Sequence, residues 1–208
     1  MAVVDHLVYA VPDLDVAVAR FAETYGVEPA QGGAHEGRGT RNALVDLGDR
    51  RYLELISVDP SQPEPARPRP FGVDGSASPR LVTYAVRADG DETIDDLAAR
   101  LRGLGRDPGE LASMSRSTPD GTVLRWRLTA PSTSLDGALP FLIDWGDTEH
   151  PSAGAPSGLS LVSLRASTRH PEAVRELVEA LGLDLEVADG GHGLHAVVET
   201  PDGRRLHL

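Results

Sequence analysis

A histidine near the start of the chain and a later glutamate are the side chains best suited to acid–base or metal chemistry. His6 lies in the apolar stretch DHLVYAV, where it shares a strand face with Val8 and Ala10. Glu54 lies inside another apolar stretch, YLELI. Burying either group costs free energy unless it is hydrogen-bonded, ion-paired or bound to a metal. Taken singly, His6 is interpreted as a hydrogen-bonded core residue and Glu54 as an exposed edge-strand residue.

A glycine-rich stretch between these two residues, HEGRGTRN, contains a further candidate, His35. If His35 is not a metal ligand, it is the best candidate for a catalytic acid or base, because the pKa of an unperturbed imidazole lies near neutrality. Gly39 permits close approach of the backbone to a ligand, and Thr40 and Asn42 offer hydrogen-bond donors and acceptors. The alternative interpretation is a turn held by local side-chain hydrogen bonds.

A later strand, GTVLRWRL, contributes a second group of binding candidates. Arg125 and Arg127 share one strand face, opposite Trp126. Facing inward, these arginines would bind a carboxylate or enolate; facing outward, which is commoner, they are solvated charges. Trp126, Phe141 and Trp145 suit the wall of a ligand cavity, although core packing is the default for aromatic residues. The predicted substrate-binding residues are Thr40, Asn42, Arg125, Trp126 and Trp145.

The composition restricts the available chemistry. The chain has no cysteine, which excludes disulfides, thiolate nucleophiles and thiolate metal sites. All 20 basic residues are arginine, which excludes a lysine Schiff base and suggests a GC-rich bacterial genome. A bound divalent metal would therefore use histidine nitrogen and oxygen ligands, which suits Zn, Mn, Fe, Ni or Mg. No dinucleotide or Walker fingerprint is present, so no nucleotide cofactor is expected.

Size and charge indicate a globular protein that acts on small molecules. The chain has 208 residues, enough for a substantial core in one domain or two small ones. Its net charge of -12 argues against nucleic acid as a partner, because phosphate binding needs clustered cations. No apolar run approaches the roughly 20 residues of a membrane helix, and the start of the chain lacks signal-peptide features. We expect a cytoplasmic protein with no membrane partner.

The elements that position the candidate residues form a unit that occurs three times. Residues 5–11 read as a strand, followed by a helix and by strands near 40–47 and 51–58. LVTYAV at 81–86 restarts the unit, and LSLVSLRAS restarts it again. The glycines that close the three predicted helices, Gly26, Gly105 and Gly182, are 79 and 77 residues apart. Such a nearly constant period indicates an internal repeat.

Two loose, proline-containing segments separate the repeats. The first, VDPSQPEPARPRPFGVDGSASP, cannot form a regular helix or a central strand, and it is predicted to be a linker or an extended strap across the surface. The predicted organisation is a first βαβββ module at 1–59, a linker at 60–80, a second module at 81–146, a linker at 147–157 and a third module of the βαββ type at 158–208.

The paired modules, with a histidine on the first strand and an acid on the last, resemble the vicinal oxygen chelate superfamily of glyoxalase I, extradiol dioxygenases and bleomycin-resistance proteins. The segments DHLVYAVPDLDVAVARF, GGAHEGRGTRNALVDLG, YLELI, LRWRL and LPFLIDWGD are most similar to its glyoxalase-like branch. The resemblance covers residues 1–150. It implies an α+β fold in which repeated modules form a cup-shaped mixed sheet around a ligand or metal, with the third module beside it.

The resemblance also implies a set of metal ligands. Aligning the two modules places Asp144 opposite Glu54, so His6, Glu54 and Asp144 form the predicted set, with His35 as a fourth candidate. Such an oxygen-rich set favours Mn, Mg or Fe. The same alignment places Leu81 where His6 stands, which departs from the four-ligand pattern of metal-dependent glyoxalases.

A small-molecule enzyme of the lyase or isomerase type is the function that the resemblance implies. A metal or a cluster of donors would polarise an oxygen-rich carbonyl or carboxylate substrate while His35 or Glu54 moves a proton. The alternatives are a non-catalytic protein that binds or sequesters a small molecule in the same cup, which Leu81 favours, and a structural relic. The unpaired third module leaves a strand edge to cover, which predicts a homodimer.

Overall fold

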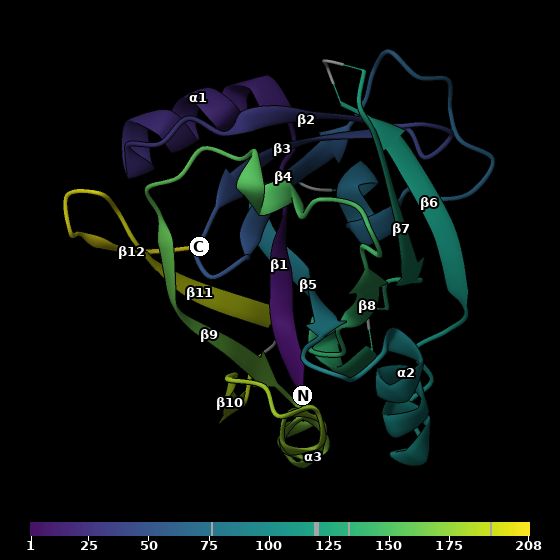
Figure 1. Ribbon diagram of the computed structural model, residues 1–208. Coiled ribbons are helices and arrows are strands. Elements are labelled where there is room, and N and C mark those ends of the chain that lie inside the picture. The colour runs from purple at the N-terminus through teal and green to yellow at the C-terminus, as the bar shows by residue number, and fades with distance from the viewer. Residues whose placement is uncertain (76, 119–120, 133, 192) are drawn as a thin grey trace.

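The computed structural model describes residues 1–75, 77–118, 121–132, 134–191 and 193–208. Within these residues the chain forms twelve strands, three α-helices and three short 3-10 helices. The strands make one eight-stranded mixed sheet and one four-stranded sheet. Figure 1 shows how they are arranged. The predicted α+β class with repeated modules is confirmed.

The first module has the order β-α-β-β-β. Its helix begins after Asp13, whose side chain accepts a hydrogen bond from the backbone N–H of Val16 at 3.0 Å. The helix ends at Gly26, which adopts the left-handed conformation with φ of 74° that glycine tolerates best. The elements are β1 (Ala2–Ala10), α1 (Leu14–Tyr25), β2 (Ala30–His35), β3 (Thr40–Asp46) and β4 (Tyr52–Val58).

The second module repeats this order. Thr93 and Asp96 form a reciprocal capping box at the start of its helix. Its strand β6 was not predicted, because the sequence LASMSRS lacks the β-branched and aromatic residues that mark most strands. The elements are β5 (Arg80–Ala88), α2 (Ile94–Gly103), β6 (Leu111–Ser117), β7 (Val123–Thr129) and β8 (Phe141–Asp144), with the 3-10 helix η2 (Ser134–Gly137) before β8.

The two modules join along their first strands. The strand order of the large sheet is β2-β3-β4-β1-β5-β8-β7-β6, in which β1 and β5 pair antiparallel. Within each module the first and last strands pair in parallel, β1 with β4 and β5 with β8. The outer strands β2 and β6 approach each other, and Arg116 of β6 donates a hydrogen bond to the carbonyl of Gly32 in β2. The sheet therefore curls into a nearly closed cup (Figure 1).

The third module forms the smaller sheet, in the order β10-β9-β11-β12. Pro171 occupies the first position of its helix, as predicted, and Gly182 ends that helix with φ of 67°. The module has one strand more than the predicted βαββ type. Its elements are β9 (Ser160–Thr168), α3 (Pro171–Leu181), β10 (Glu186–Asp189), β11 (Gly193–Glu199) and β12 (Arg205–His207).

Alternating residues of the large sheet serve two different cores. Leu7, Leu53 and Tyr84 face outward, where the three helices and the third module cover them in the main core. Val8 and Phe141 face the inside of the cup and belong to a smaller core beneath the site described below. The third module therefore covers the convex face of the sheet, and the concave face stays available for a ligand.

The proline-rich segment at 60–80 extends along the cup. It contains the 3-10 helix η1 (Pro70–Gly75), and Arg69 attaches it by donating from Nε to the carbonyl of Gly39 at 2.9 Å. The second connection contains the 3-10 helix η3 (Pro151–Ala153). None of the helices within the described residues combines the length and the hydrophobicity needed to span a membrane.

Candidate functional site

The cup encloses a cavity of about 280 Å³. This volume lies near the lower end of the range of roughly 300–1,000 Å³ for small-molecule pockets. Both modules and the proline-rich segment line it. The lining includes His6, His35, Thr40, Asn42, Tyr52 and Glu54 from the first module, Arg116, Trp126, Phe141, Ile143 and Trp145 from the second, and Arg67, Pro70 and Phe71 from the connection.

The carboxylate of Glu54 lies between two imidazoles in this cavity. Nε2 of His6 is 4.0 Å from Oε2 of Glu54, and Nε2 of His35 is 3.7 Å from Oε1. Asn42 donates from Nδ2 to Oε1 at 2.6 Å. Glu54 is only 7% exposed, and it has no arginine partner within ion-pair distance among the described residues. The structure thus brings His6, His35, Asn42 and Glu54 to one place.

His35 is held in a defined orientation. Its Nδ1 is 2.9 Å from the hydroxyl of Thr40, and its Nε2 is 3.3 Å from Nδ2 of Asn42. An amide N–H of Asn42 donates to Nε2, so Nδ1 carries the ring proton of the neutral form. Burial lowers the pKa of His35; Glu54 opposes this shift, and the charges of Arg116 and Arg38 reinforce it. The ring is therefore neutral near pH 7, the form that accepts a proton.

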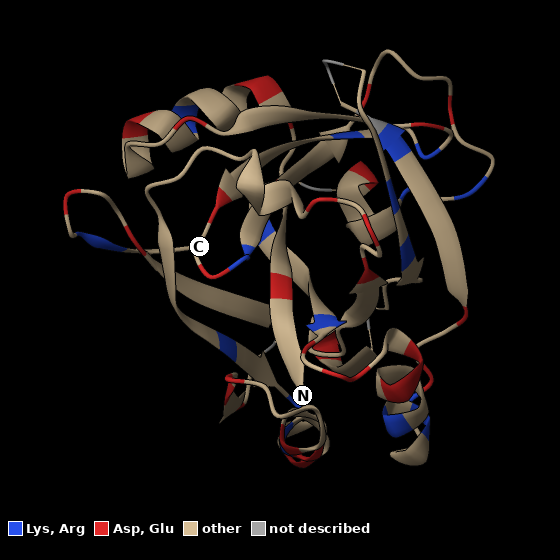
Figure 2. Cartoon of the chain, in the orientation of Figure 1, with Lys and Arg blue, Asp and Glu red and all other residues tan. Residues whose placement is uncertain are grey.

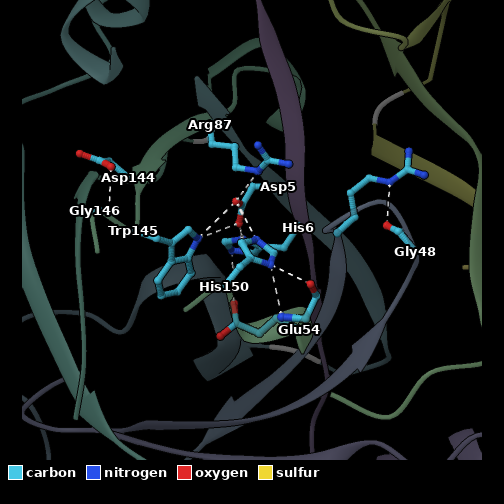
Figure 3. Close-up of polar contacts among 11 residues, drawn as sticks. Asp5, His6, Gly48, Glu54, Arg87, Asp144, Trp145, Gly146 and His150 are labelled. Atoms are coloured by element: carbon cyan, nitrogen blue, oxygen red, sulfur yellow. Dashed lines mark hydrogen bonds and ion pairs between the residues drawn. The ribbon is translucent and has the colours of Figure 1, made fainter. Parts of the chain in front are cut away.

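The orientation of the His6 ring is fixed by its sequence neighbour Asp5. Neighbouring residues of a regular strand point to opposite faces, but Asp5 has no partner in the register between β1 and β5 and forms a β-bulge. Its Oδ1 is 2.7 Å from Nδ1 of His6. The ring of Tyr52 stacks on the imidazole with a centroid separation of 4.5 Å. These contacts direct Nε2 of His6 toward Glu54, as Figure 3 shows.

Asp5 is the centre of a buried polar network that the sequence analysis did not identify. Its side chain is fully buried and accepts hydrogen bonds from Nε2 of His150 at 3.1 Å and Nε1 of Trp145 at 3.2 Å. Nε of Arg87 lies 3.3 Å away (Figure 3). Burial raises the pKa of Asp5, but the hydrogen bonds and charges of His150 and His6 outweigh it and hold the pKa well below its usual value. Figure 2 shows one acidic segment in β1, which is otherwise free of Lys, Arg, Asp and Glu. This isolated aspartate in an apolar strand is the sequence signal that could have indicated the network.

Arg116 is the charged group that the second module contributes deep in the cavity. It comes from the unpredicted strand β6 and is 5% exposed. Burial lowers the pKa of Arg116, and Tyr52 and Glu54 oppose the shift. Burial also raises the pKa of Tyr52 well above its usual value, with the charges of Asp5 and Glu54 adding to the effect, so the phenol stays protonated.

Two residues predicted for the site, Asp144 and Arg125, lie apart from the cluster of His6, His35, Asn42 and Glu54. Asp144 accepts from Nη2 of Arg127 at 2.7 Å and from the backbone N–H of Gly146 at 2.9 Å, away from His6 and Glu54 (Figure 3). Its strand neighbours line the cavity, so Asp144 faces the other side. Arg125 is exposed and does not line the cavity. The structure therefore does not assemble the predicted metal set of His6, Glu54 and Asp144.

The donors in the cavity do not fit the predicted divalent metal. Among the described residues, no group of three or more His, Asp and Glu side chains is arranged to hold one. His6, His35 and Glu54 lie near one another, but the amide N–H groups of Asn42 occupy Nε2 of His35 and Oε1 of Glu54. Arg116 adds a fixed positive charge to the same cavity, which opposes a second cation.

Paired βαβββ modules that form a cup around a small cavity define the vicinal oxygen chelate superfamily. Within it, the chain belongs to the Glyoxalase_3 family of glyoxalase-like domains, whose model matches residues 4–182. No curated protein matches the sequence.

The chain is similar to several solved structures. A hypothetical protein from Staphylococcus aureus aligns with a TM-score of 0.68 at 14% identity, covering 96% of this chain and 92% of that one. Methylmalonyl-CoA epimerase from Mycobacterium tuberculosis aligns with a TM-score of 0.44 at 22% identity, covering 69% and 87%. A variant of the Streptomyces coelicolor epimerase in complex with 2-nitronate-propionyl-CoA gives 0.45 at 23%, covering 70% and 96%. The likeness to the Staphylococcus aureus protein shows a shared fold and no more.

Proposed function

We propose that the protein is an isomerase or lyase that moves a proton at a carbon next to a carbonyl group of a small substrate. The observation that carries this proposal is the buried carboxylate of Glu54 between the imidazoles of His6 and His35 inside a cavity of about 280 Å³. Acid and base groups within a few ångströms of one enclosed space are the arrangement that proton transfer to and from carbon requires.

Glu54 is the proposed base. Asn42 holds Oε1, which leaves Oε2 to remove a proton from the substrate carbon. The electron pair of the broken C–H bond then becomes part of an enolate. His6 is the partner for the second transfer, because Asp5 engages Nδ1 and leaves Nε2, 4.0 Å from Oε2 of Glu54, to take the proton from the Glu54 carboxyl and pass it on. In an isomerase the proton returns to a neighbouring atom; in a lyase it goes to the leaving group.

The walls of the cavity support this chemistry. Trp126, Phe141 and Ile143 give the cavity apolar walls, and the proline-rich segment contributes Phe71. Apolar walls exclude water and strengthen every electrostatic interaction with a developing enolate. The small volume restricts the reacting part of the substrate to a few carbon atoms.

Solvent deuterium exchange tests the proposal without knowledge of the product. The protein is incubated in D₂O with a panel of small 2-oxo acids, 2-hydroxyaldehydes and their esters, and proton NMR measures the loss of the C–H signal next to the carbonyl. We expect exchange with at least one compound. Glu54→Gln should slow it at least about 100-fold, the usual lower bound for a general base.

A matched variant and a metal series complete the experiment. Glu23→Gln removes an exposed glutamate of α1 and should leave the exchange unchanged. Parallel samples treated with EDTA or loaded with Mn, Mg, Fe, Ni or Zn measure any dependence on a divalent metal. The proposal fails if no panel member exchanges under any of these conditions, or if Glu54→Gln exchanges as fast as the parent protein.

A second candidate function is the sequestering of a small molecule. It is favoured by the second module, whose Trp126, Phe141 and Ile143 provide contact area but no acid or base. This function predicts a ligand that survives purification and appears in the native mass spectrum, with no deuterium exchange into it in D₂O.

A further inference from the structure

A buried arginine without an acidic partner is the feature of the cavity that the proton-transfer proposal leaves unused. Arg116 is 5% exposed, and among the described residues no carboxylate forms an ion pair with it. An isolated charge in such surroundings is costly unless something binds it. Other buried or half-buried arginines of the chain do have acidic neighbours; Arg87, for example, lies 3.3 Å from Asp5.

The backbone fixes one side of the Arg116 guanidinium. Its Nη1 donates to the carbonyl of Gly32, which has no partner residue in the register between β2 and β3 and is therefore free to accept. A guanidinium carries five N–H donors in a planar fork that matches a carboxylate. One fixed donor sets the plane of the group, while its remaining donors are left for a ligand in the cavity that it lines.

The charge of the cavity differs in sign from that of the whole chain. The chain has a net charge of -12, with 32 acidic and 20 basic residues. The charged lining consists of Arg38, Arg67 and Arg116 against Glu54 and Glu110, so arginines outnumber acids there. An acidic protein that collects cations around an apolar-walled cavity attracts an anion to that cavity.

We propose that Arg116 forms a carboxylate-binding subsite and that the ligand is a small monocarboxylate. The part of this inference that concerns the reacting carbon rests on the proposed function. Arg116 and Glu54 both line the cavity but form no ion pair with each other. A short molecule fits between them, with its carboxylate on the guanidinium and its reacting carbon toward Oε2 of Glu54. Trp126 and Phe141 then contact its apolar carbons.

Binding of 2-oxobutyrate and of its neutral amide tests the subsite. Isothermal titration on the parent protein should give a Kd for the carboxylate at least about 30-fold lower than for the amide, because a buried charge pair that loses one partner loses 2 kcal/mol or more. Arg116→Gln should weaken the carboxylate about 30-fold and leave the amide little changed. Arg116→Lys keeps the positive charge but loses the planar fork of N–H donors, so its Kd for the carboxylate should be intermediate.

Arg125→Gln is the matched control, since it removes an exposed arginine from the adjacent strand β7, outside the cavity lining. It should bind both probes like the parent protein. If Arg116→Gln does not fold, the comparison of carboxylate with amide binding to the parent protein still tests the subsite. Equal binding of the two probes, or carboxylate binding that Arg116→Gln leaves intact, would overturn the inference.

The Glu54→Gln variant separates this inference from the proposed function. If it binds 2-oxobutyrate normally and no compound exchanges in D₂O, the carboxylate subsite stands and proton transfer fails. If deuterium exchange occurs only in uncharged panel members and the carboxylate does not outbind its amide, proton transfer stands and the subsite fails.

Discussion

Replacing Asp5 by asparagine should destabilise the protein strongly, although the change keeps the size of the side chain. The carboxylate accepts hydrogen bonds from His6, His150 and Trp145, and none of these groups reaches bulk solvent. Asparagine has one acceptor oxygen, and its amide would turn N–H groups toward N–H donors. Removing one partner from a buried charged network costs about 3–5 kcal/mol. At about 2–4 °C per kcal/mol for a chain of this size, the melting temperature should fall by about 6–20 °C.

Urea unfolding followed by circular dichroism measures this free energy. Asp91→Asn is the control: Asp91 is exposed, so its substitution should change the unfolding free energy by no more than about 0.5 kcal/mol. A double-mutant cycle with His150→Gln should show coupling of about 0.5–3 kcal/mol, because the two side chains share a hydrogen bond. A loss below about 1 kcal/mol for Asp5→Asn, or additivity within about 0.5 kcal/mol, would refute the network as an energetic unit.

The pH dependence provides a second readout of the same group. The pKa of Asp5 is lower in the folded protein than in the unfolded chain, where it is about 3.9. The stabilising contribution is therefore fully present above the unfolded pKa and is lost as the pH falls toward the folded one. Below about pH 4 the unfolding free energy of the parent protein should fall more steeply than that of Asp5→Asn.

Two further predictions concern His35 and Gly32. Burial lowers the pKa of His35 in the folded state, so the unfolded chain binds the proton more tightly. The unfolding free energy should therefore fall as the pH drops below about 6.5. Urea unfolding of His35→Gln should show a weaker dependence of this free energy on pH in the same range. Gly32→Ala should cost about 1–3 kcal/mol in thermal unfolding, because the new Cβ would overlap Oδ1 of Asn42 and lie 3.0 Å from its Cγ. Gly103→Ala, with nothing within 4 Å of its Cβ, is the matched control and should be neutral or stabilising. A flat parent profile, or equal stability of the two alanine variants, would contradict these expectations.

Periodicity was sufficient to predict the modules and part of the site. The helix ends at Gly26 and Gly182 and the alternation of β1 and β4 are local properties, set by backbone conformation and by which side chains alternate toward a core. They indicated that His6 and Glu54 belong together. The cost of burying polar groups marked both residues as candidates, and the family resemblance then indicated a shared role.

The positions of the remaining site residues depend on local irregularities that a repeat period does not predict. Asp144 was assigned by aligning the modules, and a shift of one residue moves a side chain to the other face of its strand. Asp5 faces its neighbour only because of a β-bulge, whose effect on side-chain direction is tertiary in origin. His150 comes from a connection, and Arg116 from a strand of polar residues. Their contacts join segments too distant in sequence for local patterns to pair.

The seam between β2 and β6 has a mechanical consequence. The strands of the first two modules pair along β1 and β5, whereas side chains join the opposite side of the cup: Arg116 donates to the carbonyl of Gly32, and Nη2 of Arg38 lies 3.4 Å from Sδ of Met114 in β6. One side of the cup is thus a continuous ladder of main-chain hydrogen bonds, and the other is closed by the side chains of two arginines. Amide hydrogens of β1 and β5 should exchange slowly with solvent, and those of β2 and β6 beside Arg116 should exchange quickly. An anion on the remaining N–H donors of Arg116 would bind the same side chain that joins β6 to β2.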